Sequence, residues 1–221
     1  LDIGCGWGGL SLTLAKDYDV NVLGITLSEE QKLIAEARAI REGIQDKVKF
    51  KILDYRADFG TFDRIVSVGM FEHVGTPNYM DYFEAIRKKL KKNGIALIHT
   101  IGRMSPPGNN SPWLDKYIFP GGYTPAMSEM VASVERNYLY ITDIEVWRLH
   151  YAKTLHHWYS RFTENEEKIR EIYDERFCRM WRYYLVACEI SFRHYQQVVF
   201  QVQISKEQEA VPLTRNYLYS N

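Results

Sequence analysis

The sequence has few cysteines, no long apolar run and no excess charge of either sign. Cys5, Cys178 and Cys188 fall in no metal-ligand spacing, and this small odd number gives no disulfide framework. We therefore expect a reducing, cytoplasmic compartment and no metal. The 28 basic and 28 acidic residues cancel, which disfavours a nucleic-acid partner. No run of about 18 uncharged apolar residues occurs, so any membrane contact should be peripheral.

The length of 221 residues and the hydrophobic content of 46% predict a single domain, 1–221, with a buried core. The first residues, Leu1-Asp2-Ile3, are typical of the end of a β-strand. We therefore expect the sequence to be a truncated part of a longer protein. The start also lacks the pattern of a signal peptide.

The first half alternates apolar runs with helical patterns, which predicts an α/β fold with a mostly parallel sheet. One helix should follow the first glycines, another should begin at Ser28 with Gln31 completing a capping box, and a third should cover 77–90. Lys91 to Gly94 is a stop signal before the fifth strand. The expected strands are Leu1–Ile3, Val20–Ile25, Val48–Ile52, Phe62–Val68 and Ile95–Thr100.

The second half is richer in turns and aromatic residues. Breaker runs at 104–110 and 119–122 enclose a short helix or lid. A helix at 125–136 and a strand near 138–146 should follow. Two long helical patterns, 151–162 and 165–192, then precede a closing strand at 197–204.

Glycines gather where the first strand turns into a helix, in Leu1-Asp2-Ile3-Gly4-Cys5-Gly6-Trp7-Gly8-Gly9. Without a Cβ, backbone can approach a ligand closely, here at the carboxyl edge of the sheet. The spacing also fits the dinucleotide pattern G-x-G-x-x-G. That site requires an acidic residue about 20 positions further on, and 23–28 offers none. Asp2 can instead compensate the sulfonium or ammonium of S-adenosylmethionine, which we favour as the cofactor. Trp7 is either a cofactor contact or a core anchor.

Several stretches resemble the cyclopropane fatty acyl phospholipid synthases and mycolic acid cyclopropane synthases, over nearly the whole chain. The stretch around Glu72 is the most specific. Members of the family carry a further region before the glycine loop. The stretches are the glycine loop, Gly24 to Ser28, Asp63 to Gly75, His99 to Gly102, Lys116 to Gly122, Trp158 to Phe162 and Arg182 to Cys188.

The resemblance implies a Class I methyltransferase sheet that uses S-adenosylmethionine and a bound bicarbonate ion. Glu72, His99 and Tyr151 are expected to be the catalytic residues and, together with the backbone around Ile101, to hold the bicarbonate. The last proton removal is assigned to that ion. The expected cofactor contacts are Asp2, Gly4, Gly6, Trp7, Gly8, Thr26, Leu27 and Gln31, with Tyr55 and Arg56 near the adenine.

The implied activity is transfer of a methylene group to the cis double bond of unsaturated phospholipid acyl chains. Segments 103–123 and 151–193 are expected to form a lid and helical insertions over the acyl-chain site. The implied location is cytoplasmic, peripheral to the inner face of the membrane, with a homodimer as a further expectation. An alkene is a poor nucleophile, so its attack on an activated methyl needs a water-free pocket with negative or π charge nearby.

Each candidate also has a structural interpretation. His99 and Tyr151 suit a buried core, and Glu72 suits a turn cap. Cys188 is expected beside the pocket as a small buried hydrophobe, with no adjacent base to make it a nucleophile. The basic run 87–92 suits a solvated helix end better than a lipid contact.

Two rival functions stay open. The first is a related lipid C-methyltransferase that yields methyl-branched or hydroxylated chains, and the second is a non-catalytic lipid-binding relative. Glu72, His99 and Tyr151 favour ring closure.

Overall fold

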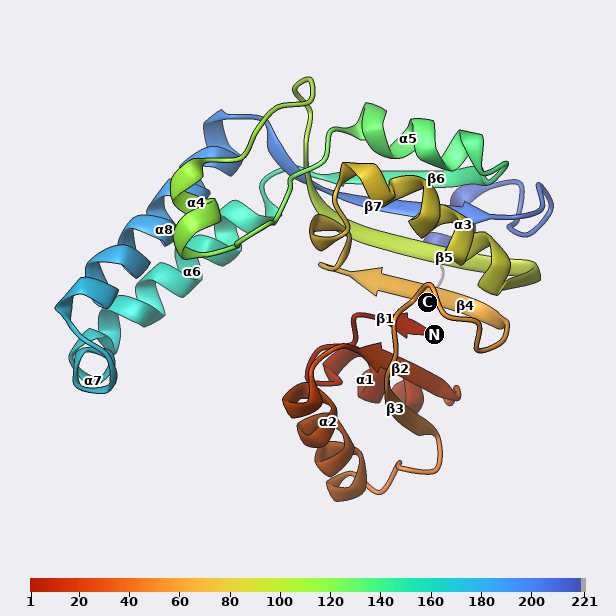
Figure 1. The fold of residues 1–221 in the computed structure, drawn as a ribbon, viewed down its shortest axis with the longest axis horizontal. Coiled ribbons are helices and arrows are strands. Elements are labelled where there is room, and N and C mark those ends of the chain that lie inside the picture. The colour runs from red at the N-terminus through yellow and green to blue at the C-terminus, as the bar shows by residue number, and fades with distance from the viewer. Residues whose placement is uncertain (220–221) are drawn as a thin grey trace.

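The computed structural model describes residues 1–219, which form a seven-stranded sheet in the order β3-β2-β1-β4-β5-β7-β6 (Figure 1). The first five strands are parallel, and β7 lies antiparallel between β5 and β6. The carboxyl ends of the parallel strands therefore meet at one edge. The strands are β1 Asp2–Ile3, β2 Val22–Thr26, β3 Val48–Ile52, β4 Phe62–Val68, β5 Leu90–Arg103, β6 Tyr140–Trp147 and β7 Gln197–Ser205.

Helices cover both faces of the sheet, and four of them form an arm to one side (Figure 1). Helices α1 and α2 pack on the face at β2 and β3, and α3 and α5 pack on the opposite face. The arm contains α4, α6, α7 and α8. The helices are α1 Gly9–Asp17, α2 Glu29–Arg41, α3 Tyr79–Lys89, α4 Pro112–Tyr117, α5 Met127–Arg136, α6 His150–Glu164, α7 Glu166–Ile172 and α8 Glu175–His194, with short 3-10 helices η1 Phe71–His73, η2 Thr76–Asn78 and η3 Arg215–Leu218.

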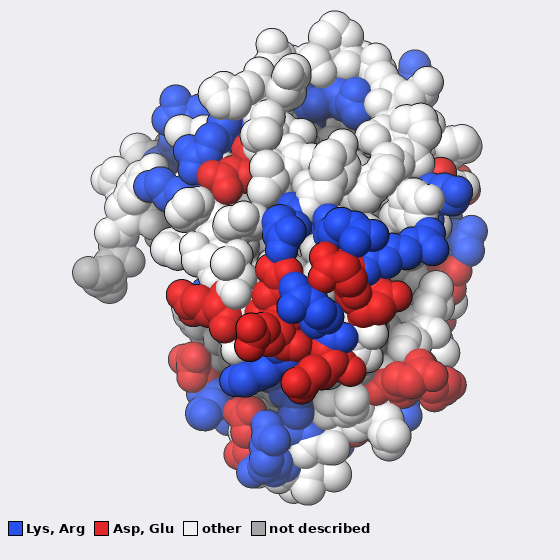
Figure 2. Space-filling model, turned by 90° about the vertical axis from the view of Figure 1, so that its left-hand side faces the viewer, with Lys and Arg blue, Asp and Glu red and all other residues white. Residues whose placement is uncertain are grey.

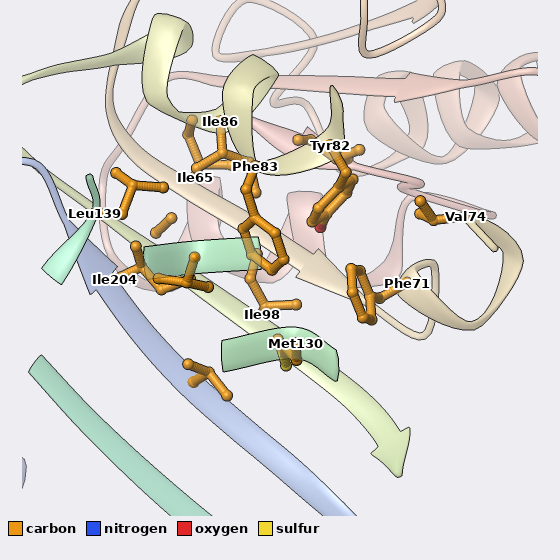
Figure 3. Packing of buried hydrophobic residues seen from close by; sticks show 14 of the residues in the cluster. Ile65, Phe71, Val74, Tyr82, Phe83, Ile86, Ile98, Met130, Leu139 and Ile204 are labelled. Atoms are coloured by element: carbon orange, nitrogen blue, oxygen red, sulfur yellow. The ribbon is translucent and has the colours of Figure 1, made fainter. Parts of the chain in front are cut away.

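The largest core cluster lies between the sheet and the helices α3 and α5 (Figure 3). Phe71 is fully buried there, with its ring stacked on Tyr79 at a centroid distance of 4.3 Å. The rings of Tyr82 and Phe83 lie 5.0 and 5.6 Å from that of Phe71. These aromatic contacts hold the η1 turn, and with it Glu72, against a rigid core.

The α/β class, the mostly parallel sheet and the helices inserted before the last strand are confirmed. Two expected boundaries are wrong. The fifth strand begins at Leu90, because Lys91 to Gly94 bulge out between the pairs Phe62–Leu90 and Arg64–Ile95 and do not end the element. The single helix expected at 165–192 is two helices.

The break between α7 and α8 has a local cause. The Asp174 carboxylate accepts a hydrogen bond from the Phe177 amide at 2.6 Å and caps α8, so the chain must leave the helical conformation at Tyr173. The capping box at Ser28 is half right. Ser28 accepts from the Gln31 amide at 3.2 Å, but the Gln31 side chain accepts from Thr26.

The surface carries charge of both signs. Figure 2 shows acidic and basic side chains interspersed over the lower part of one face, while its upper part is largely uncharged. Among residues 1–219, no helix combines the length and apolar character needed to cross a bilayer.

Replacing Phe83 by alanine tests the aromatic core. Phe83 is 0% exposed, so we expect Phe83→Ala to lower the free energy of unfolding by about 3 to 5 kcal/mol, measured by urea denaturation. Tyr18→Ala, at a side chain that is 70% exposed, should change it by less than about 0.5 kcal/mol. Equal effects of the two substitutions would contradict this description of the core.

Candidate active site

The glycine loop turns sharply at the carboxyl end of β1. Gly4, Gly6 and Gly8 have φ values of 80°, 54° and 80°, a region that side chains disfavour. A Cβ on Gly4 would lie 2.9 Å from Met70, and one on Gly8 would lie 2.8 Å from Phe50, so internal packing requires both glycines. A Cβ on Gly6 would meet no atom within 4 Å. Gly9, the first residue of α1, is equally open, and Gly6 is therefore the position with positive φ where the loop is open to a ligand.

Asp2 and Trp7 have opposite environments. Asp2 is buried, accepts a hydrogen bond from the Ser11 hydroxyl at 2.7 Å, and has its pKa raised by burial. It therefore anchors α1 to β1, and its role as a cofactor counter-ion stays a prediction. Trp7 is 50% exposed and belongs to no core cluster of the described residues, so the core-anchor interpretation is wrong.

The turn after β2 supplies the next predicted contacts. The buried Thr26 hydroxyl donates to Gln31 Oε1 at 2.7 Å and accepts from the Ser28 amide at 3.2 Å. Leu27 lies between Thr26 and Ser28, and its side chain is 74% exposed. It follows β2, which pairs with β1, the strand that precedes the glycine loop. The turn is thus held by Thr26 while Leu27 is free to cover a ligand.

The turn after β3 contains a residue that sequence reasoning missed. The Asp54 carboxylate accepts hydrogen bonds from the Arg56 backbone and from Arg56 Nε, at 2.8 and 2.9 Å. That pairing lowers the pKa of Asp54 and fixes Arg56 beside the Tyr55 ring, 5.8 Å from its centroid. The signal was available, because Asp54 lies two residues beyond a predicted strand, at the carboxyl edge.

Glu72 lies just beyond β4, joined to the glycine loop by the contact of Met70 with Gly4. Its Oε1 accepts the Ile101 amide hydrogen bond at 2.7 Å, and its Oε2 is buried without a partner. Burial raises the pKa of Glu72, and the Ile101 hydrogen bond opposes that rise. One oxygen is therefore held in place and the other is available to a ligand.

Glu72 lines a cavity of about 450 Å³ between the sheet and the arm. Ile101 of β5 shares this wall, and both expected lid segments contribute to it. Aromatic rings form much of the remainder, which favours an apolar occupant. The aromatic lining residues are Phe119, Tyr123, Tyr151, Trp158, Tyr184, Phe192 and Tyr195.

Tyr151 and Cys188 face this cavity from α6 and α8. The Tyr151 ring stacks on Phe192 at 5.3 Å, and burial followed by the charge of Glu72 raises its pKa. The Tyr151 phenol is therefore a neutral hydrogen-bond donor close to the carboxylate. Burial also raises the pKa of Cys188 to about 11, which leaves the thiol protonated and agrees with the expectation of a non-nucleophilic pocket residue.

His99 has a separate environment. Of the described residues, those that line the cavity do not include His99. Its Nδ1 lies 3.1 Å from Gln201 Nε2, and its ring packs edge-on to Trp147. Burial lowers the pKa of His99. Because an amide nitrogen only donates, Nδ1 is the acceptor and the neutral ring carries its proton on Nε2. The structure thus brings Glu72, Ile101 and Tyr151 together, with His99 two residues before Ile101 on β5 and outside the cavity wall.

The sheet order and the glycine loop at the end of β1 define the fold of the Class I, S-adenosylmethionine-dependent methyltransferases. Residues 1–202 match the family described as mycolic acid cyclopropane synthetase, and the chain belongs to that family.

Three relatives illustrate the similarity. The chain is 45% identical to the cyclopropane-fatty-acyl-phospholipid synthase of Escherichia coli (strain K12) over 206 residues, which are 93% of the chain and 53% of that protein. It matches the structure of the cyclopropane synthase MmaA2 from Mycobacterium tuberculosis with a TM-score of 0.86 and 28% identity, over 93% of this chain and 76% of that one. The mycolic acid cyclopropane synthase CmaA1, complexed with SAH and CTAB, matches with a TM-score of 0.83 and 28% identity, over 92% and 76%. The chain spans about half the length of the Escherichia coli relative.

Substituting Glu72 tests its burial. Because burial raises its folded pKa above the ordinary 4.5, the stability linked to its protonation is fully present below about pH 4.5 and is lost as the pH rises through the folded pKa. Glu72→Gln removes this loss. We expect the variant's advantage in free energy of unfolding to grow from acidic to neutral pH, measured by urea denaturation. The exposed Glu135→Gln supplies the reference, and an advantage that shrinks with rising pH would contradict the assignment.

Proposed function

We propose that this chain is the catalytic part of a cyclopropane fatty acid synthase, which transfers a methylene group from S-adenosylmethionine to the cis double bond of unsaturated phospholipid acyl chains. The observation that carries the proposal is the unpartnered, buried Glu72 Oε2 in an aromatic cavity beside the glycine loop. Family membership supports it.

The carboxyl edge of β1 to β3 fits the cofactor. Gly6 leaves backbone open to close approach, and Leu27 and Tyr55 offer apolar surface at the ends of the next two strands. When bound, S-adenosylmethionine supplies the activated methyl group. Met70 links the Gly4 backbone to the Glu72 segment, so the cofactor site and the cavity adjoin.

The cavity residues suit an alkene that becomes positively charged. The rings of Tyr151, Trp158 and Tyr184 exclude water that would trap a carbocation, and their π faces stabilise positive charge. Glu72 adds negative charge in a site of low dielectric, where it acts more strongly than in water. These residues therefore favour methyl transfer to carbon over reaction with solvent.

The polar atoms near Glu72 fit a small oxyanion that carries one proton. Glu72 Oε2 can accept a hydrogen bond from a bicarbonate hydroxyl, and the Tyr151 phenol can donate to an oxygen. When bound, bicarbonate supplies the base for the last proton. The Ile101 amide is already used by Glu72, so in this arrangement Ile101 acts by orienting the carboxylate. The His99 Nε2 hydrogen is a further donor, which stays a prediction.

The same proposal places the protein at the inner face of the membrane, in the cytoplasm, as a peripheral enzyme. The Escherichia coli relative's name includes a fatty-acyl phospholipid, which supports a phospholipid acceptor here. Segments 103–123 and 151–193 cover the acyl chain in this proposal, because both line the cavity. The homodimer stays a prediction.

Cofactor binding tests the glycine loop. We expect the full-length protein to bind S-adenosylmethionine in isothermal titration, and Gly6→Ala to bind at least about tenfold more weakly, because the added methyl occupies the ligand's place without an internal clash. Gly43→Ala is the matched control. Gly43 has a φ of 69° and equally open surroundings, but lies after α2, so its substitution should preserve affinity. Absence of binding by the unaltered protein would refute the proposed enzyme class.

Product analysis tests the reaction. With unsaturated phospholipid vesicles and labelled cofactor, we expect acyl chains that gain one CH₂ and show high-field cyclopropane protons by NMR. Glu72→Gln should abolish turnover while cofactor affinity stays nearly unchanged, and Glu135→Gln should retain turnover. A methyl-branched or hydroxylated product would instead assign the chain to the related lipid C-methyltransferases.

A further inference from the structure

One part of the cavity wall differs from the aromatic remainder. It is formed by the end of β5, the loop that follows it and the start of β7, and it carries polar side chains. Arg103 is the only lysine or arginine among the cavity-lining residues within 1–219. The polar lining residues of this part are Arg103, Ser105, Asn109, Asn110, Ser111 and Gln197.

The Arg103 guanidinium is fixed in position by its neighbours. Its Nε donates to the Thr124 carbonyl at 3.1 Å, and its Nη2 donates to Asn110 Oδ1 at 3.3 Å. The Asn110 amide donates in turn to the Gly122 carbonyl at 2.6 Å. A Cβ at Gly108 would lie 2.7 Å from Arg103 Nη1, so the loop closes tightly on the guanidinium. The cation is thus pre-organised by both breaker runs.

The charge of Arg103 is not neutralised within the described chain. Both of its acceptors are neutral, and no carboxylate of residues 1–219 lies within 4.0 Å of its nitrogens. Asp115 also lines the cavity, but its Oδ1 accepts from the Gly121 amide at 2.9 Å and pairs with no arginine. A fixed guanidinium with free donors, in a partly enclosed cavity, is suited to an anion that accepts two parallel hydrogen bonds.

We propose that Arg103 binds the phosphodiester of the phospholipid whose acyl chain occupies the aromatic part of the cavity. The proposal rests on the proposed function and adds the residue that selects an anionic lipid as the methylene acceptor. Arg103 lies two residues beyond Ile101, about 6.6 Å further along β5, so one strand carries both the proposed anion site and the amide that holds Glu72. The amides of Asn109 and Gln197 suit the ester oxygens of the glycerol.

A phosphodiester also occurs in the prosthetic arm of an acyl carrier protein. We commit to the lipid, because an acidic carrier would dock on a uniformly basic patch, and the face in Figure 2 carries interspersed charges of both signs.

Binding of two amphiphiles with the same chain tests the proposal without cofactor or turnover. Dodecyl phosphate and neutral dodecyl maltoside are titrated into full-length protein below their micelle concentrations. Arg103→Gln should weaken dodecyl phosphate binding by at least about tenfold and leave dodecyl maltoside unchanged, while Arg103→Lys should fall between. The control Arg136→Gln, at the exposed end of α5, should match the unaltered protein. The proposal would be overturned if Arg103→Gln lowered the affinity for both amphiphiles equally, because Arg103 would then only hold the loop. It would also be overturned if neither affinity changed.

A second measurement uses only the unaltered protein, so it tests the proposal even if the Arg103 variants fail to fold. In the unaltered protein, raising the ionic strength should weaken dodecyl phosphate and not dodecyl maltoside, and the absence of this difference would overturn the proposal. Phosphatidylglycerol vesicles with unsaturated acyl chains should then serve as the methylene acceptor with a higher KM in Arg103→Lys. Preference for an acyl carrier thioester would overturn the assignment to a lipid. Because the binding arms need no methyl transfer, they remain informative if the proposed function itself fails.

Discussion

The hydrogen bond from the Ile101 amide to Glu72 is the interaction on which the site depends. It exists because β4 stops short of the end of β5. The last backbone hydrogen bond between them runs from the Gly69 amide to the His99 carbonyl at 2.9 Å. The next amide of β5 that points toward β4 is that of Ile101, and β4 offers it no carbonyl. A buried amide without an acceptor is costly, and the Glu72 carboxylate supplies the acceptor.

Further along β5, the amides that point beyond the end of β4 also bond to other parts of the chain. The Arg103 amide donates to the Pro125 carbonyl at 2.9 Å, and the Tyr123 amide donates to the Glu72 carbonyl at 2.8 Å. Residues near 123–126 therefore take the place that a longer β4 would occupy. This substitution brings the lid loop, the Glu72 turn and the end of β5 into one rigid unit. A cavity with fixed polar atoms follows from backbone pairing, before any side-chain chemistry is considered.

Burial makes this carboxylate both useful and expensive. Desolvation disfavours its charge, and only one of its oxygens has a hydrogen bond. The free energy gained by burying the aromatic cluster around Phe71 offsets this desolvation (Figure 3). Phe71 is fully buried and immediately precedes Glu72. A flexible attachment would let the carboxylate rotate toward solvent. The packing of the apolar core therefore keeps the Glu72 carboxylate in a buried position that its side chain would not keep otherwise.

Local pattern was sufficient for the number and order of the strands along the chain, because most of them are short apolar runs and the glycine spacing marks the turn after β1, but it placed the start of β5 too late. It was insufficient where a partner outside the expected motif takes the side chain. Gln31 has capping-box spacing from Ser28, yet Thr26, from the preceding strand, takes its side chain. The partner of His99 is Gln201, 102 residues away, and no local spacing connects the two. The resemblance brought Glu72, Ile101 and Tyr151 into one hypothesis, but it did not indicate Arg103. Its place in the cavity depends on Thr124 and Asn110, which reach it only after the loop has folded back along β5. The position of Arg103 thus depends on contacts between residues that are distant in sequence, and local sequence pattern does not predict such contacts.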